Sequence, residues 1–164
     1  MLIIGLDRLC NLIRELVGKG YAIACVGTYL RSDDRAALEI CGRLLEAGVG
    51  VEAIMCEHGL ENCVHEIVDR GVKRLAVLDA AVLESFIEGV AVLNPNEVRD
   101  GSYLISTHSI PIDKVLEYLL SKVRDLQIVV VGIPIKNLGI GLEMSPEVER
   151  LVEKVVECFT KAGL

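Results

Sequence analysis

The 164-residue sequence lacks any apolar run long enough to span a bilayer, which needs roughly 20 apolar residues. The opening apolar run, residues 1–4, is too short for a signal peptide and is followed by Asp7 rather than by a cleavage pattern. We therefore expect a cytoplasmic protein that has no membrane partner.

Several common catalytic and nucleotide-binding motifs are also missing. Between Gly27 and Gly59 there is no G-x-G-x-x-G series and no G-K-S/T, so dinucleotide and P-loop sites lack support. There is no G-x-S-x-G elbow, and three histidines without a matching Ser or Cys motif do not make a catalytic triad. The missing phosphate-binding loop disfavours an α/β hydrolase or phosphorylase-like enzyme that acts on a small molecule.

Positive charge is scarce. The formal net charge is −7, and no basic stripe interrupts the sequence, which argues against nucleic acid as a partner. A protein partner with a basic segment is compatible with this charge.

The six cysteines form no C-x-x-C pair. Because most lie in apolar helix or strand patterns, we expect them to be small core residues in a reducing compartment, without disulfides. They are Cys10, Cys25, Cys41, Cys56, Cys63 and Cys158.

What the sequence does contain is apolar content of 52% in short runs. Short apolar strands alternate with amphipathic helices, which predicts a three-layer α/β sandwich: a mostly parallel, twisted sheet of about five strands with helices on both faces. The length fits a single domain, residues 1–164, in which residues 1–20 form an N-terminal helical extension packed on the core.

The expected elements follow from apolar spacing and turn residues. Strands are predicted at 22–27, 51–56, 74–78, 88–93 (an edge strand), 103–106 and 128–131, with a turn at 94–96. Helices are predicted at 6–18, from 35, at 61–70, from 112 and from 146, the last capped by Ser145.

Residues 22–34 are the centre of the chain. A buried strand is followed by a polar turn that ends in Asp33 and Asp34, and a helix begins near Arg35. In open α/β sheets, ligands bind at the carboxyl ends of strands, which is where this pair is placed. One Asp before a helix is usually an N-cap, but a single cap needs only one side chain.

Two further polar residues follow predicted strands. Asp79 comes after residues 74–78, and His108 comes after residues 103–106, so Asp34, Asp79 and His108 can reach the same sheet edge. Two carboxylates and an imidazole can bind a transition metal such as zinc, nickel or iron and leave coordination positions open. The alternatives are a helix cap for Asp79 and a loop hydrogen bond for His108.

A rival set of metal ligands is the C-x-H series formed by Cys56, His58, Cys63 and His65. Residues two apart on a helix point to nearly opposite sides, so a helix over 61–70 would prevent Cys63 and His65 from sharing one ion. Cys56 with His58 could also be a nucleophile and base, although a buried structural thiol is the favoured interpretation.

Five segments, in order, resemble a known family. They are G-T-Y-L-R-S-D-D at 27–34, V-L-D-A at 77–80, S-T-H-S-I-P at 106–111, V-G-I-P-I-K-N-L at 131–138 and G-L-E-M-S-P-E-V at 141–148. From about Ala22 to the C-terminus, the chain is similar to the endopeptidases that mature the large subunit of nickel–iron hydrogenases.

The resemblance implies a reaction and a set of residues. Asp34, Asp79 and His108 would recognise nickel that arrives with the substrate, and no catalytic residue is assigned. The implied activity is hydrolysis of one peptide bond, which removes the C-terminal extension of the hydrogenase large-subunit precursor after nickel insertion. The alternative is a non-catalytic nickel-binding or hydrogenase-assembly protein on the same fold.

The chain departs from the family pattern at a few positions. Thr28 replaces the family Asn, Arg35 and Ala37 replace glycines after the acid pair, and Glu57 lies in a loop that is usually rich in glycine. These changes leave the three nickel-recognising residues in place and bear on substrate specificity and activity.

Overall fold

A computed structural model describes residues 1–100 and 110–163. Its elements, in chain order, are β1 (Leu2–Gly5), α1 (Leu6–Gly18), β2 (Ala22–Gly27), the 3-10 helix η1 (Ser32–Arg35), α2 (Ala36–Glu46), β3 (Ala53–Glu57), the 3-10 helix η2 (Leu60–Cys63), α3 (Val64–Asp69), β4 (Arg74–Ala81), β5 (Gly89–Leu93), α4 (Pro95–Asp100), α5 (Ile112–Lys122), β6 (Gln127–Pro134) and α6 (Pro146–Ala162).

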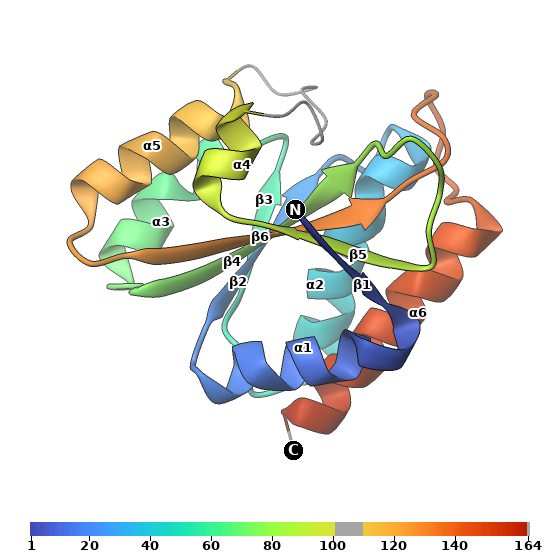
Figure 1. Ribbon diagram of the computed structural model, residues 1–164, viewed down its shortest axis with the longest axis horizontal. Helices are drawn as coiled ribbons and strands as arrows, with labels where there is room; N and C mark the ends of the chain where they lie inside the picture. Colours follow the sequence, from blue (N-terminus) through green and yellow to red (C-terminus); the bar gives the residue numbers. More distant parts are fainter. Residues whose placement is uncertain (101–109, 164) are drawn as a thin grey trace.

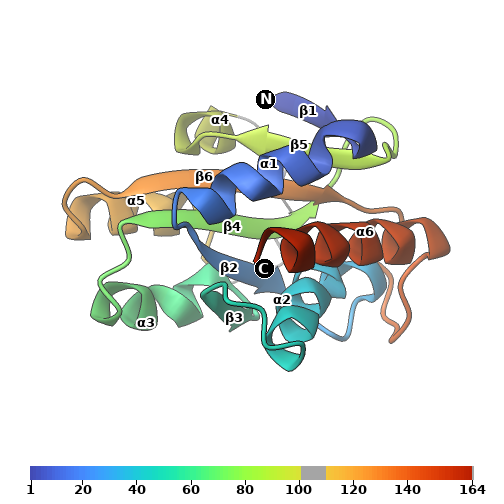
Figure 2. The same cartoon turned by 90° about the horizontal axis from the view of Figure 1, so that it is seen from below.

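Within the described residues, the sheet has six strands, and Figure 2 shows their order, β1-β5-β6-β4-β2-β3. β6, β4, β2 and β3 are parallel, whereas β5 and β1 run antiparallel to their neighbours. The central strands are almost entirely buried, as expected for parallel strands covered on both faces. The prediction of an α/β fold with a mostly parallel sheet is therefore confirmed, with one strand more than expected.

The additional strand is β1, which falls in the segment interpreted as a helical extension. β1 pairs with β5 from Leu2 opposite Val92 to Gly5 opposite Gly89. A Cβ atom at Gly89 would lie 2.2 Å from the carbonyl oxygen of Ile4, so glycine allows the two strands to approach. β5 is consequently an internal strand rather than the predicted edge strand. β1 itself was not predicted, because so short an apolar run does not show an alternating pattern.

Helices cover both faces of the sheet (Figure 1). α1, α2 and α6 pack on one face around a core that includes Leu9, Ile40 and Phe159. α3, α4 and α5 pack on the other face around a second core that includes Ile67 and Leu116. None of the helices in the two described segments is long and apolar enough to cross a membrane.

α4 was expected to be only a turn at 94–96. The side chain of Asn94 accepts the backbone N–H of Glu97 at 2.9 Å, and the Glu97 carboxylate accepts the N–H of Asn94 at 3.1 Å. This reciprocal capping box starts a short helix. The predicted strand at 103–106 lies outside the described residues.

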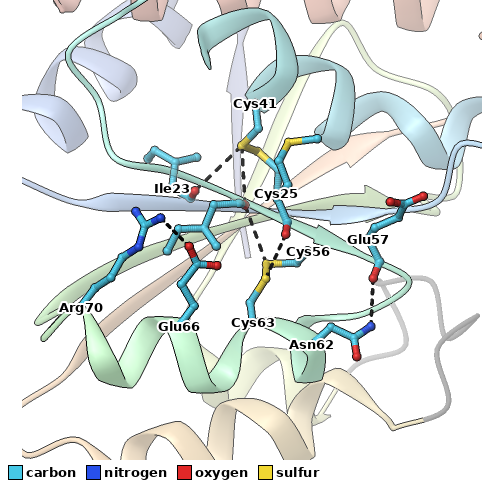
Figure 3. The surroundings of a disulfide bond; sticks show 11 residues. Ile23, Cys25, Cys41, Cys56, Glu57, Asn62, Cys63, Glu66 and Arg70 are labelled. Atoms are coloured by element: carbon cyan, nitrogen blue, oxygen red, sulfur yellow. Dashed lines mark hydrogen bonds and ion pairs between the residues drawn. A yellow bond between two sulfur atoms is a disulfide. The ribbon is translucent and has the colours of Figure 1, made fainter. Parts of the chain in front are cut away.

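All six cysteines are paired, contrary to the expectation of reduced core thiols. The disulfides are Cys10–Cys158, Cys25–Cys41 and Cys56–Cys63. The first joins α1 to α6, and the other two each join a strand to the helical segment that follows it (Figure 3). Burial was correctly expected for most of the cysteines, although Cys10 is only partly buried. The folded Cα–Cα distances of 4.8 to 6.0 Å cannot be read from chain spacing. The inference of a reducing compartment therefore loses its basis.

Candidate active site

The turn after β2 folds back onto the end of its own strand. The backbone N–H of Thr28 donates to the carbonyl oxygen of Asp34 at 3.2 Å. A Cβ atom at Gly27 would lie 2.1 Å from that same oxygen, so only glycine fits there. This close approach places the fully buried Asp34 at the carboxyl end of β2.

Asp33 has a different role from the helix cap considered for it. In the described part of the chain, no side-chain hydrogen bond caps η1 or α2. The fully buried Asp33 carboxylate instead accepts the backbone N–H groups of Lys136 (2.9 Å), Asn137 (2.7 Å) and Ser145 (2.6 Å) and the Ser145 hydroxyl (2.8 Å). Asp33 thus fastens the β2–α2 turn to the loop between β6 and α6.

Neighbouring groups strengthen this link between the two loops. The backbone N–H of Asp33 donates to the carbonyl oxygen of Asn137 at 3.1 Å, and the Ser32 hydroxyl donates to that of Gly139 at 3.0 Å. The Arg31 guanidinium donates to the carbonyl oxygen of Leu138 at 3.2 Å. The backbone of the acid-bearing turn is therefore held by residues more than 100 positions away in the sequence.

Ser145 was expected to cap α6, but no side-chain hydrogen bond from it does so. Its hydroxyl is directed to Asp33 instead, and Pro146 begins the helix. The helix start was located correctly, whereas the partner of its first polar side chain was not.

Asp79 is fully buried within β4, which continues to Ala81 rather than ending before Asp79. One of its carboxylate oxygens accepts the backbone N–H of Ala80 at 2.8 Å. Gly132 of β6 lies opposite it in the sheet. Asp79 is therefore a strand residue, and the alternative of a helix cap is wrong.

The fold brings Asp34 and Asp79 to the same end of the sheet. β2 and β4 are adjacent parallel strands, and η1, which carries Asp34, packs against β4. His108 lies outside the described residues. Within residues 1–100 and 110–163, no group of three or more His, Cys, Asp and Glu side chains is arranged to hold a metal ion. The described part of the site thus consists of two buried carboxylates.

This donor set suits a divalent cation. Carboxylate oxygens are ligands for such ions, and a cation offsets the cost of burying negative charge. Because η1 packs directly on β4, no helix separates the two acid-bearing segments.

The rival cysteine–histidine site does not form. Cys56 and Cys63 are bonded to each other, so neither thiolate is available as a ligand or a nucleophile. The side chain of His65 is 92% exposed and lies 3.0 Å from the Asp69 carboxylate. His58 is also exposed, beside Glu57.

The surroundings of the two loops shift the pKa of two side chains, Tyr29 and Glu147. Burial raises the pKa of Tyr29, and the carboxylates of Glu39 and Glu57 raise it further, so the phenol stays protonated at neutral pH. The backbone N–H of Glu147 at the start of α6, followed by the ammonium group of Lys136, lowers the pKa of the Glu147 carboxyl.

Two of the departures from the family pattern have structural explanations. Arg35 forms an ion pair with Glu39 at 2.6 Å and donates to the carbonyl oxygen of Leu142, so it connects α2 to the β6–α6 loop. Ala37 is buried in the core against the sheet. Neither residue displaces Asp34.

Sequence reasoning missed the residues that hold the site together, namely Asp33 with its partners Asn137 and Ser145. The only indication in the sequence was the pair of adjacent acids, Asp33 and Asp34, since a helix N-cap needs only one of the two side chains. Their partners lie 103 to 112 residues away, beyond the reach of any local pattern.

Comparison with known proteins identifies the family. Residues 58–162 match the family model for hydrogenase maturation proteases of the HycI type. No curated protein sequence matches the chain.

Solved structures agree with this result. The fold is similar to a NiFe hydrogenase maturation protease HycI from Thermococcus kodakarensis KOD1, with a TM-score of 0.76 and 21% identity over 93% of this chain and 97% of that one. It is also similar to the NiFe hydrogenase maturation protease HybD from Thermococcus kodakarensis, with a TM-score of 0.65 and 26% identity over 88% of this chain and 99% of that one. The endopeptidase HycI from Escherichia coli gives a TM-score of 0.70 and 20% identity over 85% of this chain and 88% of that one. The chain therefore belongs to the hydrogenase maturation protease family.

Proposed function

We propose that this protein is the endopeptidase that removes the C-terminal extension from a nickel–iron hydrogenase large-subunit precursor after nickel insertion. Membership of the protease family supports the reaction class. The observation that carries the assignment is the placement of two fully buried aspartates, Asp34 and Asp79, at one end of adjacent parallel strands. The alternative of a non-catalytic assembly protein is not favoured by the family match.

Nickel is part of the substrate in this proposal. Asp34 and Asp79 would recognise the ion carried by the precursor, and His108 would supply an imidazole nitrogen. Carboxylate and imidazole ligands suit divalent nickel, and three protein ligands leave positions open for the precursor's own groups. Recognition of nickel would then restrict cleavage to precursors that have already received the metal.

Peptide hydrolysis at this site needs a water molecule and a place for its proton. Water adds to the scissile carbonyl carbon, its proton passes to a base, and the C–N bond breaks as the leaving nitrogen is protonated. Either a carboxylate of the pair or the ion that it binds would activate the water. We assign no covalent nucleophile, since both thiols near this end of the sheet, Cys56 and Cys63, are in a disulfide.

We also propose that the protein acts in the cytoplasm. Its three disulfides do not contradict this location, because intracellular proteins of hyperthermophiles are an exception to the rarity of cytosolic disulfides.

Cleavage of nickel-loaded and nickel-free precursor, followed by intact-mass measurement, tests the proposal. We expect the wild-type protein to shorten only the nickel-loaded precursor. Asp79→Asn should reduce the rate at least about 100-fold, since changing even the outer partners of metal ligands typically costs about 10- to 100-fold. Asp69→Asn, on the exposed side of α3, is the matched control and should cut at the wild-type rate.

Three outcomes would contradict parts of this account. Equal cleavage of nickel-free precursor would remove nickel from the mechanism. A wild-type rate for Asp79→Asn would remove that residue from the site. Binding of the precursor without any cleavage would favour the assembly protein.

A further inference from the structure

Two loops at the carboxyl end of the sheet expose large apolar side chains. Leu30, in the β2–α2 turn, is 58% exposed, and Ile140 and Leu142, in the β6–α6 loop, are 94% and 67% exposed. Single exposed apolar residues are common, but here three come from two segments that meet only in the fold. We call Leu30, Ile140 and Leu142 the apolar rim.

Backbone pairing joins the two loops that carry the apolar rim. Arg31 and Gly141 form a parallel β-bridge, in which the N–H of Gly141 donates to the carbonyl oxygen of Leu30 at 3.0 Å. Leu30 is thus bonded through its backbone to the residue that lies between Ile140 and Leu142, so the three members of the apolar rim come together where the two loops meet. A Cβ atom at Gly141 would lie 2.9 Å from the Ser32 hydroxyl, which shows how closely the two loops approach there.

Hydrogen bonds between the two loops fix the backbone that carries the rim. The Asp33 carboxylate accepts four hydrogen bonds from the β6–α6 loop. Arg31 and Arg35 donate to the carbonyl oxygens of Leu138 and Leu142, on either side of Ile140. These bonds hold the backbone of both loops in place, so the exposed apolar side chains are carried on an ordered surface. Large apolar side chains that gather on the surface mark an interaction site.

The rim lies beside the candidate active site. Leu30 is four residues before Asp34 in the same turn, and Figure 1 shows the two loops next to each other beyond the end of the sheet. An adjoining groove of about 380 Å³ runs from Leu142 past Arg35, Glu39, Arg43 and Glu149. Its charges are already matched within the protein, with Arg43 2.7 Å from Glu149 and Arg35 2.6 Å from Glu39. The apolar rim is therefore the part of this face that gains most from being covered.

We propose that the apolar rim binds an extended, apolar segment of the large-subunit precursor next to the bond that is cut. The proposal rests on the proposed function, which requires a polypeptide substrate to bind at the carboxyl end of the sheet, where Asp34 and the apolar rim both lie. It assigns to Leu30, Ile140 and Leu142 a role in substrate affinity that is separate from the chemistry at the buried acids.

A triple variant, Leu30→Gln with Ile140→Thr and Leu142→Gln, tests the proposal with nickel-loaded precursor. Binding is followed by biolayer interferometry, and cleavage is followed by intact mass. In the wild type, binding would bury each of these apolar side chains, and the triple variant lacks that contribution. We therefore expect Kd and KM to rise at least about tenfold, while kcat changes less than about twofold. Leu45→Gln, at a 53% exposed leucine at the far end of α2, is the matched control and should change neither.

The outcomes separate this proposal from the proposed function. A wild-type protein that binds the precursor without cutting it contradicts the protease assignment, and Kd for the triple variant still tests the rim. Unchanged Kd and KM in a folded triple variant overturn the rim alone. A wild-type protein that does not bind the precursor contradicts both the rim and the proposed function. If the triple variant alters only the oligomeric state, measured by light scattering, the rim contacts a second copy and the proposal is wrong.

Discussion

The loops at the carboxyl end of the sheet and the helical layer of α1, α2 and α6 are stabilised by different interactions. In the loops, one buried carboxylate, that of Asp33, accepts four hydrogen bonds that join two segments. In the helical layer, apolar burial is supplemented by the disulfides Cys10–Cys158 and Cys25–Cys41.

This difference separates the stability of the domain from the geometry of its site. A disulfide acts largely by restricting the unfolded chain, so its loss lowers stability without moving the acids. Loss of a buried hydrogen-bond acceptor leaves several donors unsatisfied at one place, so it disturbs the loops that frame Asp34. The following variants test this comparison.

The largest effect on stability is expected from the double variant Cys10→Ser with Cys158→Ser. This disulfide spans 148 residues, and the chain-entropy model gives a loss of about 5 kcal/mol in the free energy of unfolding. Cleavage measured well below the melting temperature should be retained. Chemical denaturation gives the free energy, and the Cys56–Cys63 pair, which spans 7 residues, should cost only about 2 kcal/mol when removed. A greater loss from the shorter loop would show that the entropy of the unfolded chain does not dominate.

Asp33→Asn should reduce both stability and cleavage. An amide cannot accept all four hydrogen bonds and turns an N–H group toward other donors, so we expect a cost of about 3 kcal/mol. Ser145→Ala removes only the hydroxyl donor and should cost about 1 kcal/mol. Thermal unfolding and precursor cleavage are measured for both variants. If Asp33→Asn melts at the same temperature as Ser145→Ala, Asp33 does not hold the two loops together.

Gly27→Ala should disturb the turn, with a cost of about 2 kcal/mol from overpacking. Its Cβ atom would overlap the carbonyl oxygen of Asp34, so cleavage should fall more steeply than stability. Gly42→Ala is the matched control, because a Cβ atom there has no neighbour within 4 Å and helix α2 gains from alanine. If both variants cleave the precursor at the wild-type rate, the close approach at Gly27 does not control the position of Asp34.

The smallest effect concerns pH. The pKa of Glu147 is lowered from its ordinary value of 4.5 in the folded state, so its ionised form stabilises folding. That contribution is fully present above 4.5 and is lost as the pH falls through the lower, folded pKa. Melting curves of the wild type and Glu147→Gln should therefore differ slightly at neutral pH and converge in acid. If the difference between the two melting curves grows as the pH falls, the ionised form of Glu147 does not stabilise the folded state.

Much of the fold could be predicted from local patterns. The buried strands around Ala24, Val77 and Val130 and the helix starts at Pro111 and Ser145 were found because apolar spacing and capping residues act over a few positions. Placement of Asp34 and Asp79 at one end of the sheet followed from the strand–turn–helix order.

The rest depends on contacts between distant segments. The role of Asp33 requires partners beyond position 135, and the disulfide of Cys10 requires α1 to lie against α6. β1 was missed because its four residues pair with a strand more than 80 positions away. The role of His108 stays a prediction, since that residue lies outside the described part of the chain.

The central claim is that two adjacent aspartates have separate duties: Asp33 holds the loops, and Asp34 takes part in the reaction. The rate at which Asp34→Asn cleaves nickel-loaded precursor tests it most directly, in a sample whose thermal unfolding is compared with that of the wild type. We expect a folded protein whose rate is reduced at least about 100-fold, since changing even the outer partners of metal ligands typically costs about 10- to 100-fold. A folded Asp34→Asn protein that cleaves at the wild-type rate would contradict the claim.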